Sequence, residues 1–327
     1  MDEFQFIKHI EQNFYRQSTI RKGTGDDAAV FTQNYQETVV AKDMLVENVH
    51  FSRKTMEPFH IGYKGLAANI SDLAAMGASP AFYLVGISIP PNWSIKEIED
   101  IYNGFKAISN HYGMDLIGGD TVSGNELVLS VTVIGFVNKN RIRYRHLAKD
   151  GDVVFVTGHL GDSQAGLHLL TSATSMERFN DVDYFIHRHR MPTPRVKFSK
   201  AIETIPRVSL NDISDGLASE ANEIAEASQV DIIIFDKKIP SHPSYNQFPL
   251  NDQKKWKYFG GEDFELLGTV SPSDWSKLEE AARISDTRLS KIGYVSDKKD
   301  RSGRVYLERT GQSRIQLKKE GYNHLSR

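Results

Sequence analysis

Strand-like and helix-like segments alternate along most of this 327-residue chain. Apolar runs rich in β-branched residues predict strands at 28–31, 37–45, 81–89, 114–117, 126–137, 153–157, 231–235, 264–270 and 289–295. Pro58 begins a predicted helix that Gly77 ends, and Ser94 with Glu97 predicts a capping box at the start of another helix. Some neighbouring strands are joined by short turns, so we expect a mixed α/β (α+β) fold and not a purely doubly wound sheet.

The length of the chain favours about two domains of roughly 150 residues each. The segment 138–152 is polar and basic, and it separates two stretches of alternating strands and helices. We therefore place a domain boundary there. The sequence predicts an N-terminal domain at 1–148 and a C-terminal α/β domain at 149–327.

Composition excludes several classes of function. The chain has 40 Lys and Arg against 42 Asp and Glu, and this net charge of −2 argues against a dedicated nucleic-acid-binding protein. It has no cysteine, which excludes disulfides, thiolate metal sites and cysteine nucleophiles. No apolar run reaches the ~18–20 residues of a membrane helix, and Met1-Asp2-Glu3 lacks the basic start of a signal peptide. We expect a soluble, cytoplasmic protein without a membrane partner.

Carboxylates recur beside glycine at the predicted ends of strands and helices. The clusters are Gly25-Asp26-Asp27, Lys42-Asp43, Gly118-Gly119-Asp120, Asp212-Ile213-Ser214-Asp215-Gly216 and Gly260-Gly261-Glu262-Asp263. Asp72 is the exception, since it lies inside the predicted Pro58 helix. One such Asp is an ordinary turn residue, but several that converge would repel one another and need cations. Carboxylate oxygens favour Mg²⁺, which commonly bridges protein to phosphate, so the pattern indicates nucleotide phosphate chemistry.

Other phosphate-binding motifs fit poorly. The chain has no P-loop and no protein-kinase motif set. Gly23-Thr24-Gly25-Asp26-Asp27-Ala28 fits the loose dinucleotide pattern, but a polar segment precedes it and a strand follows. The basic run 187–190 predicts a solvated helix face, with a phosphate or partner contact as the alternative. Arg141, Arg143 and Arg145 alternate along an extended segment, which would place all three on one face, suited to phosphate or to surface ion pairs.

Taken in order, motifs along nearly the whole chain resemble the thiamine-monophosphate kinase family, within the ATP-binding superfamily that includes aminoimidazole-ribonucleotide synthetase. The motifs are Gly25-Asp26-Asp27-Ala28-Ala29, Asp43-Met44-Leu45-Val46-Glu47 with His50-Phe51, Asn69-Ile70-Ser71-Asp72-Leu73-Ala74-Ala75-Met76-Gly77-Ala78, Ile117-Gly118-Gly119-Asp120-Thr121, Gly161-Asp162-Ser163-Gln164-Ala165-Gly166-Leu167, Pro192-Thr193-Pro194-Arg195, Asp212-Ile213-Ser214-Asp215-Gly216-Leu217, Gly260-Gly261-Glu262-Asp263-Phe264-Glu265-Leu266 and Gly321-Tyr322.

The resemblance implies a two-domain aminoimidazole-ribonucleotide synthetase-like fold and a homodimer formed through N-domain strands. It implies ATP-dependent phosphorylation of thiamine monophosphate to thiamine diphosphate with several Mg²⁺ ions. The implied metal ligands are Asp27, Asp43, Asp72, Asp120, Asp212 and Asp215. The implied ATP contacts are Gly119, Asp120, Arg145 and Ser214, and the implied substrate contacts are His50, Glu262 and Tyr322. No protein nucleophile is expected, because the substrate's own phosphate is already ionised near neutral pH.

The chain departs from the family pattern just before Asp43. Ala41 and Lys42 stand where the family usually has hydroxyl residues, which leaves the number of Mg²⁺ ions open. The alternatives are another ATP-using enzyme of the same superfamily and a non-catalytic regulator that binds Mg²⁺-ATP. Selenophosphate synthetase is a poor match, since it usually carries a reactive Cys or selenocysteine.

Overall fold

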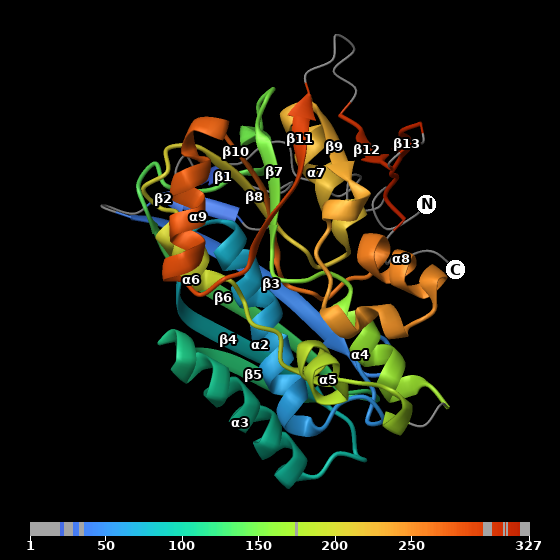
Figure 1. Ribbon diagram of the computed structural model, residues 1–327. Helices are drawn as coiled ribbons and strands as arrows, with labels where there is room; N and C mark the ends of the chain where they lie inside the picture. The colour runs from blue at the N-terminus through green and yellow to red at the C-terminus, as the bar shows by residue number, and fades with distance from the viewer. Residues whose placement is uncertain are drawn as a thin grey trace.

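The computed structural model describes residues 20–22, 29–32, 36–173, 176–296, 303–309, 311 and 313–320, and it contains two β-sheets with helices packed against them (Figure 1). The first sheet has the strand order β1-β2-β3-β6-β4-β5, and of the strands that the structure describes there only β4 and β5 run parallel. Its strands are β1 (Ile20–Lys22), β2 (Ala29–Thr32), β3 (Gln36–Val46), β4 (Ser79–Ile89), β5 (Asp115–Ser123) and β6 (Val128–Asn138).

The second sheet has the order β13-β12-β9-β11-β7-β10-β8, and among its described strands only β9 and β12 run parallel. Its strands are β7 (Val153–Thr157), β8 (Val208–Asp212), β9 (Asp231–Phe235), β10 (Leu266–Val270), β11 (Leu289–Ser296), β12 (Val305–Glu308) and β13 (Ile315–Gln316). The helices of this half are α4 (Asp162–Thr171), α5 (Val182–Arg190), α6 (Val196–Ala201), α7 (Leu217–Ser228), α8 (Leu250–Phe259) and α9 (Trp275–Ile284). Two mixed sheets confirm the predicted mixed α/β class.

Helices α2 (Pro58–Ala75) and α3 (Ile95–Tyr112) pack against the first sheet and against each other. Their backbones approach so closely that a Cβ on Gly62 would lie 1.9 Å from the carbonyl oxygen of Ile101. The predicted capping box of α3 is formed, since Ser94 Oγ accepts from the backbone N–H of Glu97. The capping box therefore begins α3 where the sequence predicts it, and Gly62 allows the two helices to pack closely.

Helix α2 also joins the two halves of the chain. The carbonyl oxygen of Ala74 accepts a 2.6 Å hydrogen bond from Ser199 on α6, and Ala75 belongs to the apolar core of the second half. Ser71 donates a 2.7 Å hydrogen bond to Asp212 at the end of β8. In Figure 1, α2 crosses in front of β3, between the two sheets. One face of α2 thus packs on the first sheet and another on the second half.

Strand β5 forms one edge of the first sheet, and all nine of its residues are exposed. Its ladder with β4 continues to Ser123, so Gly118-Gly119-Asp120 lies inside the strand. Our expectation that this cluster ends a strand is wrong. Asp43 also lies inside its strand, because β3 pairs with β6 as far as Val46.

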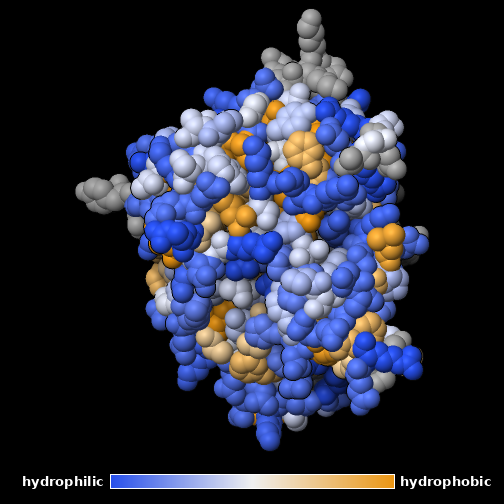
Figure 2. All heavy atoms as spheres, in the orientation of Figure 1, coloured by the Kyte–Doolittle hydropathy of each residue, from blue (hydrophilic) through white to orange (hydrophobic). Residues whose placement is uncertain are grey.

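The view in Figure 2 shows a mostly hydrophilic face on which hydrophobic residues form small separate groups. Apolar side chains are instead concentrated in cores under each sheet. In the described part of the chain, no helix is both long and apolar enough to cross a bilayer.

Candidate active site

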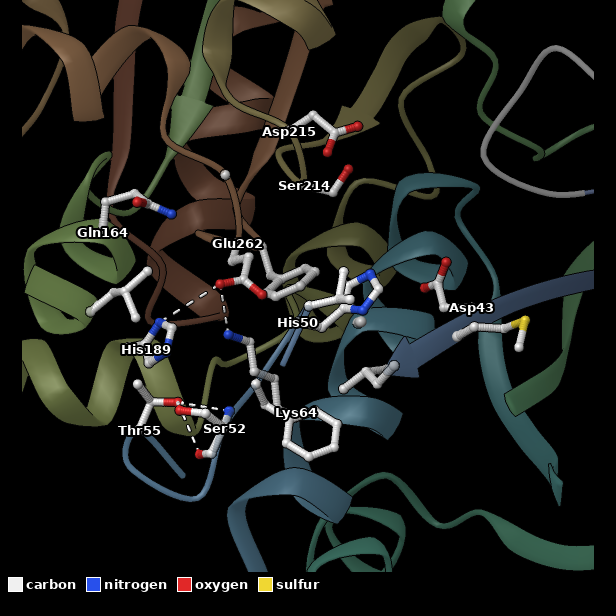
Figure 3. Close-up of a pocket in the computed structure, with 18 of the residues that line it drawn as sticks. Asp43, His50, Ser52, Thr55, Lys64, Gln164, His189, Ser214, Asp215 and Glu262 are labelled. Carbon is white, nitrogen blue, oxygen red and sulfur yellow. Dashed lines mark hydrogen bonds and ion pairs between the residues drawn. The ribbon is translucent and has the colours of Figure 1, made fainter. Parts of the chain in front are cut away.

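A cavity of about 1000 Å³ lies between the two halves of the chain. Asp43 and His50 line it from the first half, and Ser214, Asp215 and Glu262 line it from the second. Figure 3 shows these side chains around one opening, with Glu262 near its centre. The structure thus brings five of the site residues inferred from the sequence to a single cavity.

Glu262 is held at the cavity wall by residues from both halves. Its Oε2 lies 2.8 Å from Nζ of Lys64 on α2 and 3.7 Å from Nδ1 of His189 on α5 (Figure 3). The backbone of Glu262 adopts a left-handed conformation, with φ 67°, and its N–H donates to the carbonyl oxygen of Ser214. This turn directs the carboxylate toward the cavity.

The electrostatics around Glu262 are set by burial. The side chain of Lys64 is 2% exposed, and burial lowers the pKa of its ammonium while Glu262 raises it. Burial, together with the nearby cations Lys64 and Arg190, lowers the pKa of His189 to about 2. His189 is therefore neutral near pH 7, and Lys64 is the cation that balances Glu262.

The loop that carries Glu262 is anchored on its other side. Asp263 accepts hydrogen bonds from the N–H groups of Gly161 and Ser163 at the start of α4, and burial raises the pKa of Asp263 to about 8. Glu265 is fully buried and pairs with Arg188, at 2.9 Å, and with Arg195. Glu262 thus points into the cavity, whereas Asp263 and Glu265 point away from it into the protein interior.

The expectation of a solvated basic face at 187–190 is wrong for two of its four residues. Arg188 is 7% exposed and His189 is 1% exposed, because α5 packs against α4 and its Arg188 reaches the loop beneath. The arginine series is also corrected. Arg143 is 2% exposed and donates to the carbonyl oxygen of Ile202, so it does not share an open face with Arg141 and Arg145.

The turn after β8 places Ser214 and Asp215. Glu220, in the first turn of α7, accepts from the N–H of Asp215 at 3.1 Å and from Oγ of Ser214 at 3.4 Å. Gly216, with φ 108°, begins the helix, and a Cβ there would meet the backbone of Phe259. Helix α7 therefore holds the turn against the cavity.

Three of the inferred acidic ligands meet one short stretch of α2. The N–H of Asp43 donates to Asn69, at 3.1 Å, and Ser71 donates to Asp212. Asp72 follows Ser71 in the chain. Residues 69–72 of α2 therefore connect the strand of Asp43, Asp72 itself and the strand of Asp212.

Lys42 and Asp43 occupy opposite faces of β3. Lys42 and Met44 are exposed, whereas Ala41 and Leu45 are buried on the face that Asp43 shares. The alternation agrees with the pleat of an extended strand. Lys42 thus points to the face opposite the α2 contacts of Asp43, and it still lines the same cavity.

Other inferred site residues lie apart from the cavity wall. Asp43, Val131, Val85 and Gly119 are in register across four strands, so Gly119 is three strand spacings, about 14 Å, from Asp43. Asp120 follows Gly119 on the exposed edge strand and accepts from the N–H of Thr121. Arg145 donates to Asn211, beside Asp212. Two further assignments, Asp27 and Tyr322, lie outside the described residues.

The donor set suits Mg²⁺ but does not enclose it. Asp43 and Asp215 offer carboxylate oxygens to the cavity, which are the ligands Mg²⁺ prefers. Within the described ranges, no three His, Asp or Glu side chains lie close enough together to hold a metal ion by themselves. Mg²⁺ commonly takes one or two carboxylates and completes its shell with water and phosphate oxygens, so the residues fit that mode.

Comparison with known proteins agrees with this fold. Residues 25–137 match the N-terminal domain of AIR synthase related proteins, and residues 149–305 match the C-terminal domain. The two-domain architecture is therefore that of an AIR synthase related protein. A thiamine-monophosphate kinase of Bacillus subtilis (strain 168) is 46% identical over 327 residues, which are 99% of each chain. The chain belongs to the thiamine-monophosphate kinase family, and it is a kinase.

Solved structures give the same result. The thiamine-monophosphate kinase of Stenotrophomonas maltophilia K279a has a TM-score of 0.76 and 32% identity, over 91% of this chain and 93% of that one. AaThiL in complex with AMPPCP and TMP has a TM-score of 0.82 and 28% identity, over 99% of this chain and 97% of that one. The hydrogenase maturation protein HypE, at 18% identity and a TM-score of 0.70, shares the fold.

Sequence reasoning missed Lys64 and His189. Apart from His60, Lys64 is the only basic or acidic residue in the run 58–71. A single cation on such an apolar helix is a signal for a buried partner. His189 gave no such signal, because the neighbouring arginines make its segment read as surface.

Proposed function

We propose that this chain transfers the γ-phosphoryl group of ATP to thiamine monophosphate and forms thiamine diphosphate. The observation that carries the proposal is the shared cavity. His50 and Glu262, assigned to the substrate, line it together with Ser214, assigned to ATP, and Asp43 and Asp215, assigned to metal. Its volume of about 1000 Å³ is at the upper end of ligand pockets, which supports room for two substrates.

The proposed reaction needs no protein nucleophile. The phosphate of thiamine monophosphate attacks the γ-phosphorus of ATP in line, and the bond to the β-phosphate oxygen breaks as ADP leaves. The acceptor is already ionised near neutral pH, since its second pKa is ~6. The principal barrier is bringing two anions together in the right geometry.

Residues of this chain supply that geometry. We assign Asp43, Asp72, Asp212 and Asp215, with Asp27 and Asp120, to Mg²⁺, and Gly119, Arg145 and Ser214 to ATP. Bound Mg²⁺ would screen the repulsion between the phosphates and stabilise the charge that develops during transfer. His50, whose Nδ1 accepts from the N–H of Val46 at 3.0 Å, keeps a fixed ring orientation for the substrate.

We also propose a homodimer formed through strands of the first sheet. No strand in the described part of the chain pairs with the outer side of β5, and Leu116, Ile117 and Val122 are about half exposed along it. An exposed apolar edge is a common site for pairing with another chain.

The test is a turnover assay with purified protein, ATP, Mg²⁺ and thiamine monophosphate, in which thiamine diphosphate is measured by chromatography. Product that disappears with EDTA and in Asp215→Asn supports both the reaction and the metal assignment. Binding of Mg²⁺-ATP without product would instead favour another substrate of the superfamily or a regulator.

A further inference from the structure

We infer that Lys64 is a positioning residue for the phosphate-accepting substrate, because it fixes the Glu262 carboxylate at the cavity wall across the boundary between the two halves. The inference rests on the proposed function. Lys64 is on α2 in the first half, and Glu262 is in the loop between α8 and β10 in the second. The 2.8 Å contact between Lys64 Nζ and Glu262 Oε2 therefore links helix packing to the substrate subsite.

Lys64 is almost completely buried, at 2% exposed, whereas its partner Glu262 is 29% exposed and lines the cavity. An ion pair that only stabilised the fold would not need one partner at the cavity wall. A buried ammonium is costly, and apolar residues of similar volume often replace such groups without loss of stability. A lysine in this position is therefore better explained by what it does to the carboxylate than by its contribution to folding.

The geometry leaves one carboxylate oxygen for a ligand. Both Lys64 and His189 contact Oε2, and no hydrogen bond or ion pair to a residue in the described part of the chain involves Oε1. Neutral His189 also lies 3.2 Å from Ser163 Oγ through the same Nδ1, so its ring is held in place. With its charge balanced by Lys64, Glu262 presents Oε1 as an acceptor for an N–H or O–H group of the substrate.

The decisive experiment is a double-mutant cycle of Lys64→Met and Glu262→Gln with steady-state kinetics for each substrate. For Lys64→Met we expect KM for thiamine monophosphate to rise about tenfold, while kcat and KM for ATP change less than about threefold, since the loss is in substrate binding. In the Glu262→Gln background, Lys64→Met should add little, because both changes disrupt one interaction. Lys64→Arg should restore part of the affinity.

Lys277→Met is the matched control, since Lys277 forms a 2.7 Å ion pair with Asp274 on the surface and neither residue lines the cavity. Urea unfolding and calorimetric binding of thiamine monophosphate on the same variants separate folding from positioning. If Lys64→Met is too unstable to assay, Lys64→Gln and Glu262→Gln give the same comparison.

Two outcomes are distinguishable. Additive losses in the cycle, or equal losses of affinity for both substrates, would overturn the positioning role while leaving the proposed reaction intact. A wild-type protein that neither binds nor phosphorylates thiamine monophosphate would overturn the proposed function, and this inference with it.

Discussion

Ser71 on α2 and Asp212 at the end of β8 are joined by a 2.7 Å hydrogen bond, although 141 positions separate them in the chain. Both side chains are buried. The bond brings the strand end of the second half against the helix of the first, one residue away from Asp72. The hydroxyl of Ser71 thus helps to set the position of the Asp212 carboxylate relative to Asp72.

Replacing Ser71 with alanine should therefore affect stability and activity together. The buried Asp212 carboxylate loses one donor, at a cost of about 1–3 kcal/mol in the free energy of unfolding. Urea unfolding measures the first effect and the turnover assay the second. Ser109→Ala is the control, since Ser109 bonds within its own helix. Wild-type stability in Ser71→Ala would contradict the role of this bond.

Asp43→Asn should lower turnover by about 100-fold or more at fixed Mg²⁺, because an amide is a poor ligand for a hard cation and carries no charge. Its backbone contact with Asn69 does not depend on the carboxylate, so folding should be retained. A Mg²⁺ titration of the assay tests the cause, since higher Mg²⁺ should recover part of the rate. Asp274→Asn on the surface is the matched carboxylate control, and an Asp43→Asn enzyme with a wild-type Mg²⁺ dependence would refute the ligand assignment.

The stability of the protein should decrease as pH falls below about 6.5, the ordinary pKa of histidine. Burial holds the pKa of His189 at about 2 in the folded state, so only the unfolded chain takes up this proton between those values. For one such group, the free energy of unfolding changes by at most about 1.4 kcal/mol per pH unit. Urea unfolding at several pH values should show a shallower decrease for His189→Gln than for the wild type.

In that experiment Asp263 has the opposite effect, since its pKa is raised to about 8 and its folded form favours the proton. The comparison of variants, and not the wild-type curve alone, therefore isolates His189. Exposed His111→Gln provides the matched substitution. Parallel curves for wild type and His189→Gln would show that the buried ring does not contribute this linkage.

Ile117→Lys should weaken the proposed homodimer, because it places a charge on the exposed edge strand where we expect the two copies to meet. Ile117 is 51% exposed in the single chain. Analytical ultracentrifugation across a range of concentrations measures the effect as a shift toward monomer. Ile95→Lys, at a more exposed isoleucine at the start of α3, is the control. An unchanged association constant would exclude this part of β5 from the interface.

Local signals predicted the fold well where one element decides its own boundaries. Pro58, Gly77 and Ser94 mark ends of helices in the structure as in the sequence, because caps and left-handed glycine act over a few residues. The edge strand β5 was predicted too short. Its extension through Gly118-Gly119-Asp120 depends on pairing with β4, which local propensity does not contain.

The candidate site was predicted in part for a similar reason. Acidic and glycine motifs could be assigned from their order in the chain, and five of the inferred residues share the cavity. Lys64 and His189 could not be assigned in this way, because their role comes from contact with Glu262. Glu262 is 198 positions from Lys64 and 73 from His189 in the chain. Charge type alone described residues 187–190 as surface, and only packing of α5 shows which of them are buried.

The double use of helix α2 limits how this chain can be recombined with its relatives. A chimera that joins the first half of one kinase to the second half of another receives α2 from one parent and its partners at Asp212, Ser199 and Glu262 from the other. Each mismatch between α2 and these partners would change both the core packing and the cavity wall. Exchange is therefore expected to succeed only when the residues on both sides of α2 are inherited as one block.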